Sequence, residues 1–187
     1  SSLADSGAPR LIAVGGLSGS GKSTVVRQVA PNIGNGFGAI VLRSDVARKR
    51  LFGLRPETPL GADGYRREVS ERVYAALAKY AARALRAGFS VVLDAAFLSD
   101  ENQRWAEDVA RRLDVDFTGL WLDCPADELR RRVSARKNDA SDADLAVLET
   151  QLDREPDAPG WTKVDASGEM SASAANARPA LGLADAP

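Results

Sequence analysis

A nine-residue stretch near the start of the chain has the residue types and spacing of a phosphate-binding loop. Its residues are Gly16, Leu17, Ser18, Gly19, Ser20, Gly21, Lys22, Ser23 and Thr24. The first eight fit G-x-x-x-x-G-K-[ST] without a mismatch, a pattern in which backbone N–H groups surround nucleotide phosphates. We expect Lys22 to reach the β- and γ-phosphates and the Ser23 hydroxyl to ligate Mg²⁺. No Asn-Lys-x-Asp guanine motif occurs, so the predicted cofactors are ATP and Mg²⁺.

Two aspartates follow predicted strands and are candidates for the remaining chemistry. Asp45 is a candidate general base or metal ligand, and Arg48 lies three residues later on the same helix face. The alternative makes Asp45 a helix-capping acid and Arg48 a solvated surface charge. Asp94 ends an apolar run as a metal-binding aspartate would, although it could also cap a loop. Ala95 follows it instead of a glutamate, which favours phosphoryl transfer to an acceptor over a dedicated hydrolase.

A basic segment between residues 130 and 137 contains two further candidates, Arg132 and Arg136. They are four residues apart and would share a helix face. If this segment forms a mobile lid, one of the two arginines is expected to reach the γ-phosphate and stabilise the transition state. The alternative is an ordinary solvated basic face.

Short apolar runs alternate with helical patterns along the chain. The runs lie at residues 11–17, 39–42, 89–93, 117–122 and 162–164. Alternation of this kind predicts an α/β fold with a parallel sheet covered by helices on both faces. We interpret residues 10–167 as one domain, residues 1–9 as a linker or tag remnant, and residues 168–187 as a low-complexity C-terminal tail.

Composition excludes several classes of function. The 187 residues carry a formal net charge of -1, so no overall field favours nucleic acid or anionic lipid. The chain has no histidine and a single cysteine, which excludes His-based triads and internal disulfides. No run has the length of a membrane helix or the form of a secretory signal, so we expect a cytoplasmic protein without a membrane partner.

Four segments in this order resemble those of P-loop kinase-like ATPases, found alone or behind aminoglycoside-phosphotransferase-like domains. The segments are GLSGSGKST, LRSDVARKRLFG, VVLDAAF and LWLDCPADELRRRVSAR. More loosely, they resemble gluconate kinases, zeta-toxin kinases and polynucleotide 5′-kinases. The resemblance covers about residues 10–165. It implies a P-loop three-layer sandwich with the strand order 2-3-1-4-5, an Asp-x-x-Arg pair at Asp45 and Arg48, and lid arginines at Arg132 and Arg136. It also raises a fused or associated domain as a partner.

These observations predict an ATP- and Mg²⁺-dependent kinase that phosphorylates a hydroxyl of a small molecule. In this interpretation Ser23, Asp94 and Asp45 are the candidate metal ligands, and Asp45 is also the candidate base. One alternative is a nucleotide-binding ATPase or regulatory module of a larger protein. Another is a nucleic-acid 5′-kinase, which is disfavoured because little basic or aromatic sequence is available to bind a strand.

Overall fold

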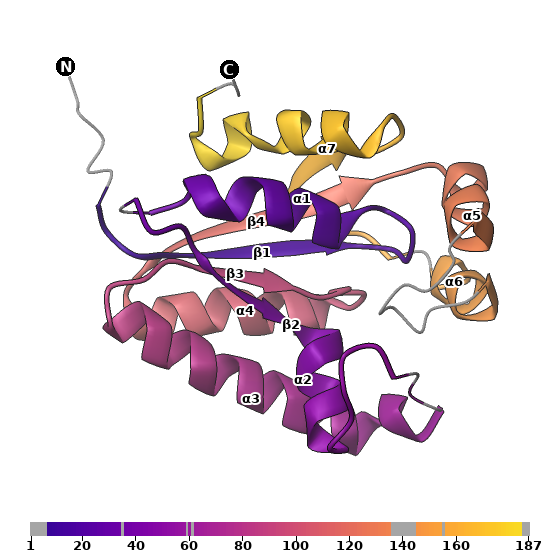
Figure 1. Cartoon of the computed structure of the whole chain (residues 1–187), viewed down its shortest axis with the longest axis horizontal. Helices are drawn as coiled ribbons and strands as arrows, with labels where there is room; N and C mark the ends of the chain where they lie inside the picture. Colours follow the sequence, from indigo (N-terminus) through magenta and orange to yellow (C-terminus); the bar gives the residue numbers. More distant parts are fainter. Residues whose placement is uncertain are drawn as a thin grey trace.

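A five-stranded, wholly parallel sheet forms the centre of the protein (Figure 1). Its strands are β1 (Arg10–Gly16), β2 (Ile40–Arg43), β3 (Val91–Asp94), β4 (Asp116–Asp123) and β5 (Thr162–Asp165). Their order in the sheet is β2-β3-β1-β4-β5. The computed structural model describes residues 7–34, 36–58, 60, 62–135, 145–154 and 156–184. The order 2-3-1-4-5 implied by the family resemblance is therefore confirmed. Because all strands are parallel, the carboxyl ends of β1, β2 and β3 meet at one edge of the sheet, where ligands bind in open α/β sheets.

Strands and helices alternate along the described chain as the apolar pattern predicted. The α-helices are α1 (Lys22–Val29), α2 (Ser44–Leu51), α3 (Arg67–Arg86), α4 (Asp100–Leu113), α5 (Ala126–Ala135), α6 (Leu145–Leu152) and α7 (Met170–Ala177). Short 3-10 helices lie at Ala30–Asn32, Ala62–Tyr65 and Pro179–Leu181.

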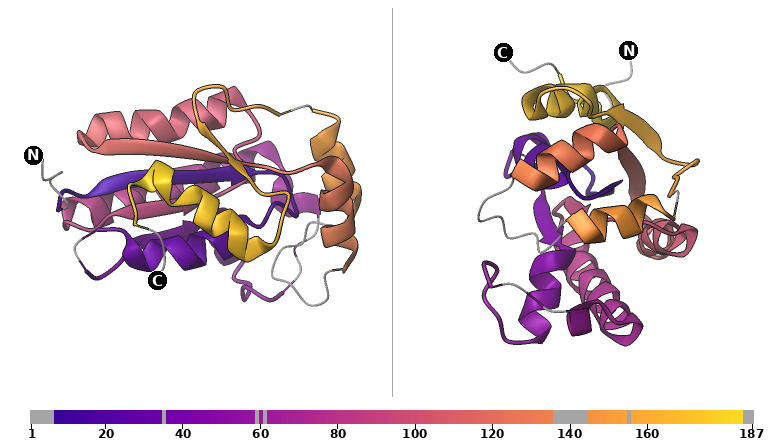
Figure 2. Two further views of the ribbon diagram at one scale, coloured as in Figure 1. Left: turned by 90° about the horizontal axis from the view of Figure 1, so that it is seen from above. Right: turned by 90° about the vertical axis from the view of Figure 1, so that its right-hand side faces the viewer.

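Helices cover both faces of the sheet, with α1 and α7 on one side and α3 and α4 on the other (Figure 2). A hydrophobic cluster lies between the helices and the sheet on each side. Side chains alternate between the faces of a strand, so Ile12 of β1 packs beneath α1 and α7, whereas Leu11 packs against the side of α3 and α4. On the second side, Gly119 of β4 lies directly against the Trp161 indole, and a Cβ at Gly119 would overlap that ring. This close packing fixes the sheet, and with it the strand ends that form the site.

The C-terminal segment differs from the tail that its composition suggested. Residues 170–177 form α7, and Ala174, Ala177 and Leu181 are buried in the same cluster as the apolar face of α1. Small alanine side chains let α7 approach α1 closely, which a composition-based interpretation undervalues. The Arg10 guanidinium donates to the Leu181 carbonyl at 2.8 Å, so the last packed turn is also tied to the start of β1.

No helix within the described ranges combines the length and the apolar character needed to cross a membrane.

Candidate nucleotide and phosphoryl-transfer site

The loop between β1 and α1, here called the phosphate loop (residues 16–24), has the backbone that its glycines predict. Gly19 and Gly21 both have φ of 88°, in the left-handed region that favours glycine. A Cβ at Gly19 would also lie 3.0 Å from Val133 Cγ2 and 3.1 Å from the Leu129 carbonyl oxygen. The loop leads directly into the N-terminus of α1, where helical N–H groups and the helix dipole favour an anion.

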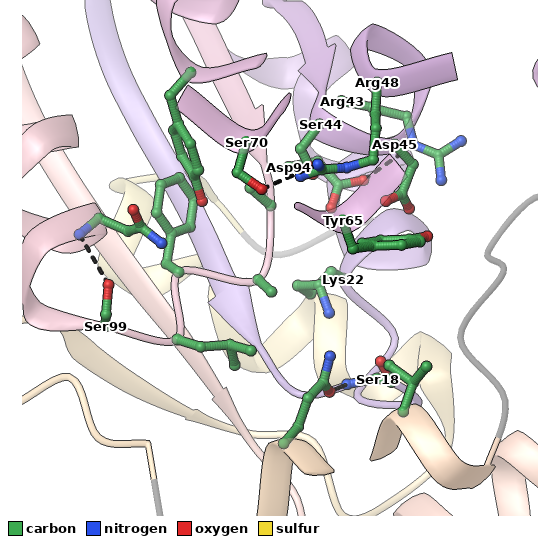
Figure 3. Close-up of a pocket in the computed structure, with 18 of the residues that line it drawn as sticks. Ser18, Lys22, Arg43, Ser44, Asp45, Arg48, Tyr65, Ser70, Asp94 and Ser99 are labelled. Atoms are coloured by element: carbon green, nitrogen blue, oxygen red, sulfur yellow. Dashed lines mark hydrogen bonds and ion pairs between the residues drawn. The ribbon is translucent and has the colours of Figure 1, made fainter. Parts of the chain in front are cut away.

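Lys22 lies across this loop. Its ammonium donates to the carbonyl of Gly16 at 2.8 Å and to that of Leu17 at 3.0 Å, and it lines the cavity described below (Figure 3). A phosphate entering the loop therefore meets a cation already held beside it. The loop is also supported from α6, because the Ser18 backbone N–H donates to Gln151 Oε1 at 2.8 Å.

Ser23 and Asp94 form a polar corner where β1 and β3 end. The Ser23 hydroxyl donates to Asp94 Oδ2 at 2.8 Å, so these two candidate metal ligands lie in contact. The Asp94 carboxylate is only 6% exposed, so it requires partners. Arg43, at the end of β2, donates from Nε to the same Asp94 oxygen at 3.2 Å and from Nη2 to Ser23 Oγ at 3.0 Å.

The oxygens of this corner fit Mg²⁺. Mg²⁺ in nucleotide sites uses one or two protein oxygens, completes its octahedron with phosphate oxygens and waters, and avoids closed protein cages. Within the part of the chain that the structure describes, no cluster of three or more acidic, Cys or His side chains is placed to hold a metal. A hydroxyl and a carboxylate beside a phosphate loop match the one or two protein oxygens that Mg²⁺ uses in such sites.

Asp45 lies in the first turn of α2 and lines the same cavity as Lys22 and Asp94. Burial raises the pKa of its carboxyl above the usual 3.8, and the nearby Asp94 carboxylate raises it further. The positive charges of Lys22 and Arg43 act in the opposite direction on this pKa. The carboxyl is thus a stronger base than a solvated aspartate, which suits proton abstraction near neutral pH.

Arg48 is turned away from solvent, unlike the surface charge considered as its alternative. It is 8% exposed and donates to the Gly64 carbonyl at 2.7 Å and to Ser70 Oγ at 3.1 Å. Its guanidinium lies over the Tyr65 ring, 5.0 Å from the ring centre. These contacts join α2 to α3 and shape the cavity wall, while contact of Arg48 with a reacting group stays a prediction.

Arg132 lies on α5, but its side chain does not line the cavity as that of a lid arginine would. Its side chain is buried behind the phosphate loop, where it donates to Glu128 Oε1 and the Gly168 carbonyl, each at 2.6 Å, and to the Gly19 carbonyl at 3.4 Å. Hydrogen bonds from Arg131 and Arg132 lower the pKa of Glu128 to about 2. Arg132 therefore supports the loop from behind instead of pointing at its ligand. Arg136 lies outside the described residues.

One cavity of about 1220 Å³ is lined by the candidate residues Lys22, Ser23, Arg43, Asp45, Arg48 and Asp94 (Figure 3). Arg132 does not line it. Another part of the cavity lining consists of aromatic, hydroxyl and amide side chains, and we call it the aromatic half. It comprises Tyr65, Ser70, Tyr74, Ser99, Asn102 and Trp105. Burial raises the pKa of Tyr74 to about 12, so its phenol stays protonated as a hydrogen-bonding group. Sequence reasoning missed Arg43 and this half, because no motif marks side chains that converge only through folding.

A parallel sheet of this order, with a glycine-rich phosphate loop between β1 and α1 and an aspartate ending β3, defines a P-loop nucleotide-binding fold. The family model AAA_33, described as an AAA domain, matches residues 11–156, and the chain belongs to this family. The prediction of a P-loop kinase-like family is thereby confirmed.

Solved structures with the same fold include several kinases. A sugar kinase from Janibacter sp. has a TM-score of 0.66 at 21% identity, over 94% of this chain and 96% of that one. A gluconokinase from Sinorhizobium meliloti has a TM-score of 0.65 at 22% identity, over 94% and 93%. The Mycobacterium tuberculosis APS kinase, in complex with AMPPNP and APS, has a TM-score of 0.66 at 19% identity, over 94% and 99%. No curated protein matches this sequence.

Proposed function

We propose that this chain is an ATP- and Mg²⁺-dependent kinase that transfers the γ-phosphate of ATP to a hydroxyl of a small molecule. The observation that carries the proposal is the shared cavity. Lys22 and the phosphate loop, the Ser23–Asp94 corner and the Asp45 carboxyl all line it, with room for a nucleotide and a second compound. The sugar kinase, gluconokinase and APS kinase with this fold support the same reaction class.

In the proposed reaction, the phosphate loop and Lys22 hold the triphosphate and neutralise its charge. Ser23 Oγ and Asp94 would hold Mg²⁺, which would supply further charge neutralisation on the phosphates. Asp45 accepts the proton of the acceptor hydroxyl as its oxygen forms a bond to the γ-phosphorus. The bond from that phosphorus to the β,γ-bridging oxygen breaks, and ADP leaves with the electron pair.

The lining of the aromatic half favours a small acceptor over a nucleic acid. Two basic side chains that line the same cavity are already engaged: Arg48 with the Gly64 carbonyl and Ser70, and Arg67 with Glu71 at 2.9 Å. A groove that binds a nucleic-acid strand would instead present a row of basic side chains to the phosphates of that strand. Hydroxyl and amide groups between aromatic rings suit a compact hydroxyl compound. We place this ATP-dependent activity in the cytoplasm. A fused or associated domain could supply the acceptor or receive the product.

A transfer assay tests the proposal. The protein is incubated with γ-labelled ATP, Mg²⁺ and a fractionated metabolite pool, with the Lys22→Ala variant as the control. We expect a labelled phosphate ester from the unaltered protein, and neither tight ATP binding nor transfer from the variant, because Lys22 acts on both ground and transition states.

Two outcomes would contradict this expectation differently. Unchanged ATP affinity and turnover in Lys22→Ala would remove the phosphate loop from the reaction. Tight ATP binding without any labelled acceptor across all fractions would favour the alternative, a nucleotide-binding regulatory module.

A further inference from the structure

Arg43 occupies an unusual place in the phosphoryl-transfer site. It ends β2, and in the parallel pairing of β2 with β3 its register partner is Asp94. Its guanidinium therefore reaches the Asp94 carboxylate and the Ser23 hydroxyl together, at 3.2 Å and 3.0 Å. These are the two side chains whose oxygens would bind Mg²⁺ in the proposed function.

The hydrogen bonds of the corner engage the oxygens that the metal needs. Ser23 Oγ donates to Asp94 Oδ2 and accepts from Arg43, so part of its capacity to donate electron pairs to a metal is in use. The same Asp94 oxygen accepts from both Ser23 and Arg43. A guanidinium and a dication compete for these oxygens at contact distance, because the two positive charges repel each other and both draw on the same electron pairs.

Arg43 also satisfies a physical requirement of the site before nucleotide binds. An almost fully buried carboxylate without a countercharge is costly, and the Arg43 guanidinium supplies one at the sheet edge. Its own side chain is 27% exposed and lines the cavity, so it has space to leave the carboxylate without unpacking the core.

We propose that Arg43 is a positioning residue that acts as an internal cation: it holds Ser23 and Asp94 in place until Mg²⁺ bound to nucleotide displaces it. This inference rests on the proposed function in assigning the metal to Ser23 and Asp94. It gives Arg43 two opposed effects. The arginine offsets the negative charge of Asp94 when ATP binds without metal, and it competes with Mg²⁺ when the metal is present.

The test measures binding of the non-hydrolysable analogue AMPPNP by titration calorimetry, with and without Mg²⁺, in the Arg43→Gln variant and the unaltered protein. Without metal, we expect Arg43→Gln to bind AMPPNP more weakly, because Asp94 then repels the phosphates. In Arg43→Gln, the Mg²⁺ concentration at which half of the metal's effect on AMPPNP affinity is reached should be about tenfold lower than in the unaltered protein. This is the effect expected when the metal no longer has to displace one charge-assisted hydrogen bond. Binding of Mg²⁺ to the nucleotide in solution is common to all variants and cancels in the comparison.

Two further variants are controls. Arg50→Gln removes the same charge from an exposed position on α2, and its Mg²⁺ dependence should match that of the unaltered protein. Arg43→Lys keeps a cation but lacks the guanidinium fork, so it should fall between Arg43→Gln and the unaltered protein. Thermal melts establish that each variant is folded, and Arg43→Lys provides the same test if the glutamine variant is not.

Several results would overturn the proposal. A Mg²⁺ midpoint in Arg43→Gln equal to that in Arg50→Gln would show that Arg43 does not compete with the metal. An equal loss of AMPPNP affinity with and without Mg²⁺ would make Arg43 a plain phosphate ligand. If the unaltered protein binds AMPPNP but Mg²⁺ has no effect on it, the metal site fails along with this inference, whereas absence of any nucleotide binding removes the proposed function itself.

Discussion

Replacing Asp45 by Asn separates chemistry from nucleotide binding, because the change removes a base and leaves the phosphate loop intact. The side chain keeps its size while losing its charge and most of its basicity. In the structure Asp45 faces the cavity from the first turn of α2, where the raised pKa of its carboxyl makes it a better base than a solvated aspartate. A positioned general base contributes about 10²- to 10⁴-fold in rate, which corresponds to about 3 to 5 kcal/mol in the barrier.

We therefore expect Asp45→Asn to lower turnover by about 10²- to 10⁴-fold while ATP affinity stays nearly constant. Turnover is measured with an acceptor identified by the transfer assay, and affinity by calorimetry with AMPPNP. Asp116→Asn is the matched control, because this exposed carboxylate starts β4 at the other end of the strands from the site. Full turnover in Asp45→Asn would refute the role as base, and a selective loss of Mg²⁺-dependent affinity would make Asp45 a metal ligand instead.

Asp45→Asn should also change the stability of the protein, and the sign of this change follows from the raised pKa of Asp45. Burial and Asp94 raise the pKa of Asp45 above its unfolded value of 3.8, so the native state holds this proton at pH values where the unfolded chain has released it. The ionised carboxyl therefore lowers stability at neutral pH, and this effect disappears as the pH falls to 3.8 and below. Without Mg²⁺ and nucleotide, Asp45→Asn should melt above the unaltered protein at pH 7, with the difference shrinking on acidification. A lower melting temperature at pH 7 would show that the carboxylate is stabilising.

Two further predictions concern the support of the site. Arg132→Ala should lower the free energy of unfolding by roughly 1 to 3 kcal/mol, because it removes a buried guanidinium together with its hydrogen bonds to Glu128 and to the Gly19 and Gly168 carbonyls. It should also weaken ATP binding. Denaturant unfolding measures the first effect and calorimetry the second. A loss of turnover at unchanged stability would return Arg132 to the role of a lid arginine. Gly119→Ala should lower the free energy of unfolding by about 1 to 3 kcal/mol, because the added Cβ overlaps the Trp161 ring. A melting temperature equal to that of the unaltered protein would show that the indole moves freely.

The parts of the site that sequence predicted are those held by one continuous segment. The phosphate loop needs only nine adjacent residues between a strand and a helix, and the structure folds them as expected. The positions of Asp45 and Asp94 could also be predicted, because Asp45 lies two residues after β2, Asp94 ends β3, and parallel strands end at a common edge.

What sequence could not predict depends on contacts between distant segments. The link from Arg43 to Asp94 requires the β2–β3 register, and the burial of Arg132 requires the segment around Gly168 to pass behind the phosphate loop. Arg48 has the spacing of a site residue, yet its partners Gly64 and Ser70 come from the following loop and helix. Composition predicts a tail where the structure has α7, a short helix rich in Ala and Ser, because the stability of this helix comes from packing on α1 and hardly from its own residues.

The hydrogen bond from Arg10 to the Leu181 carbonyl brings the two ends of the described fold together. Figure 1 shows these ends on the side of the molecule away from α5, α6 and the phosphate loop. Adjacent ends of this kind permit circular permutation and insertion into a surface loop of another protein. A short linker could join residues 184 and 10 while the chain is opened at an exposed loop such as that around Gly36, and the order of the strands in the sheet would be unchanged. The fold can thus be placed within a longer polypeptide with both junctions far from the reacting groups.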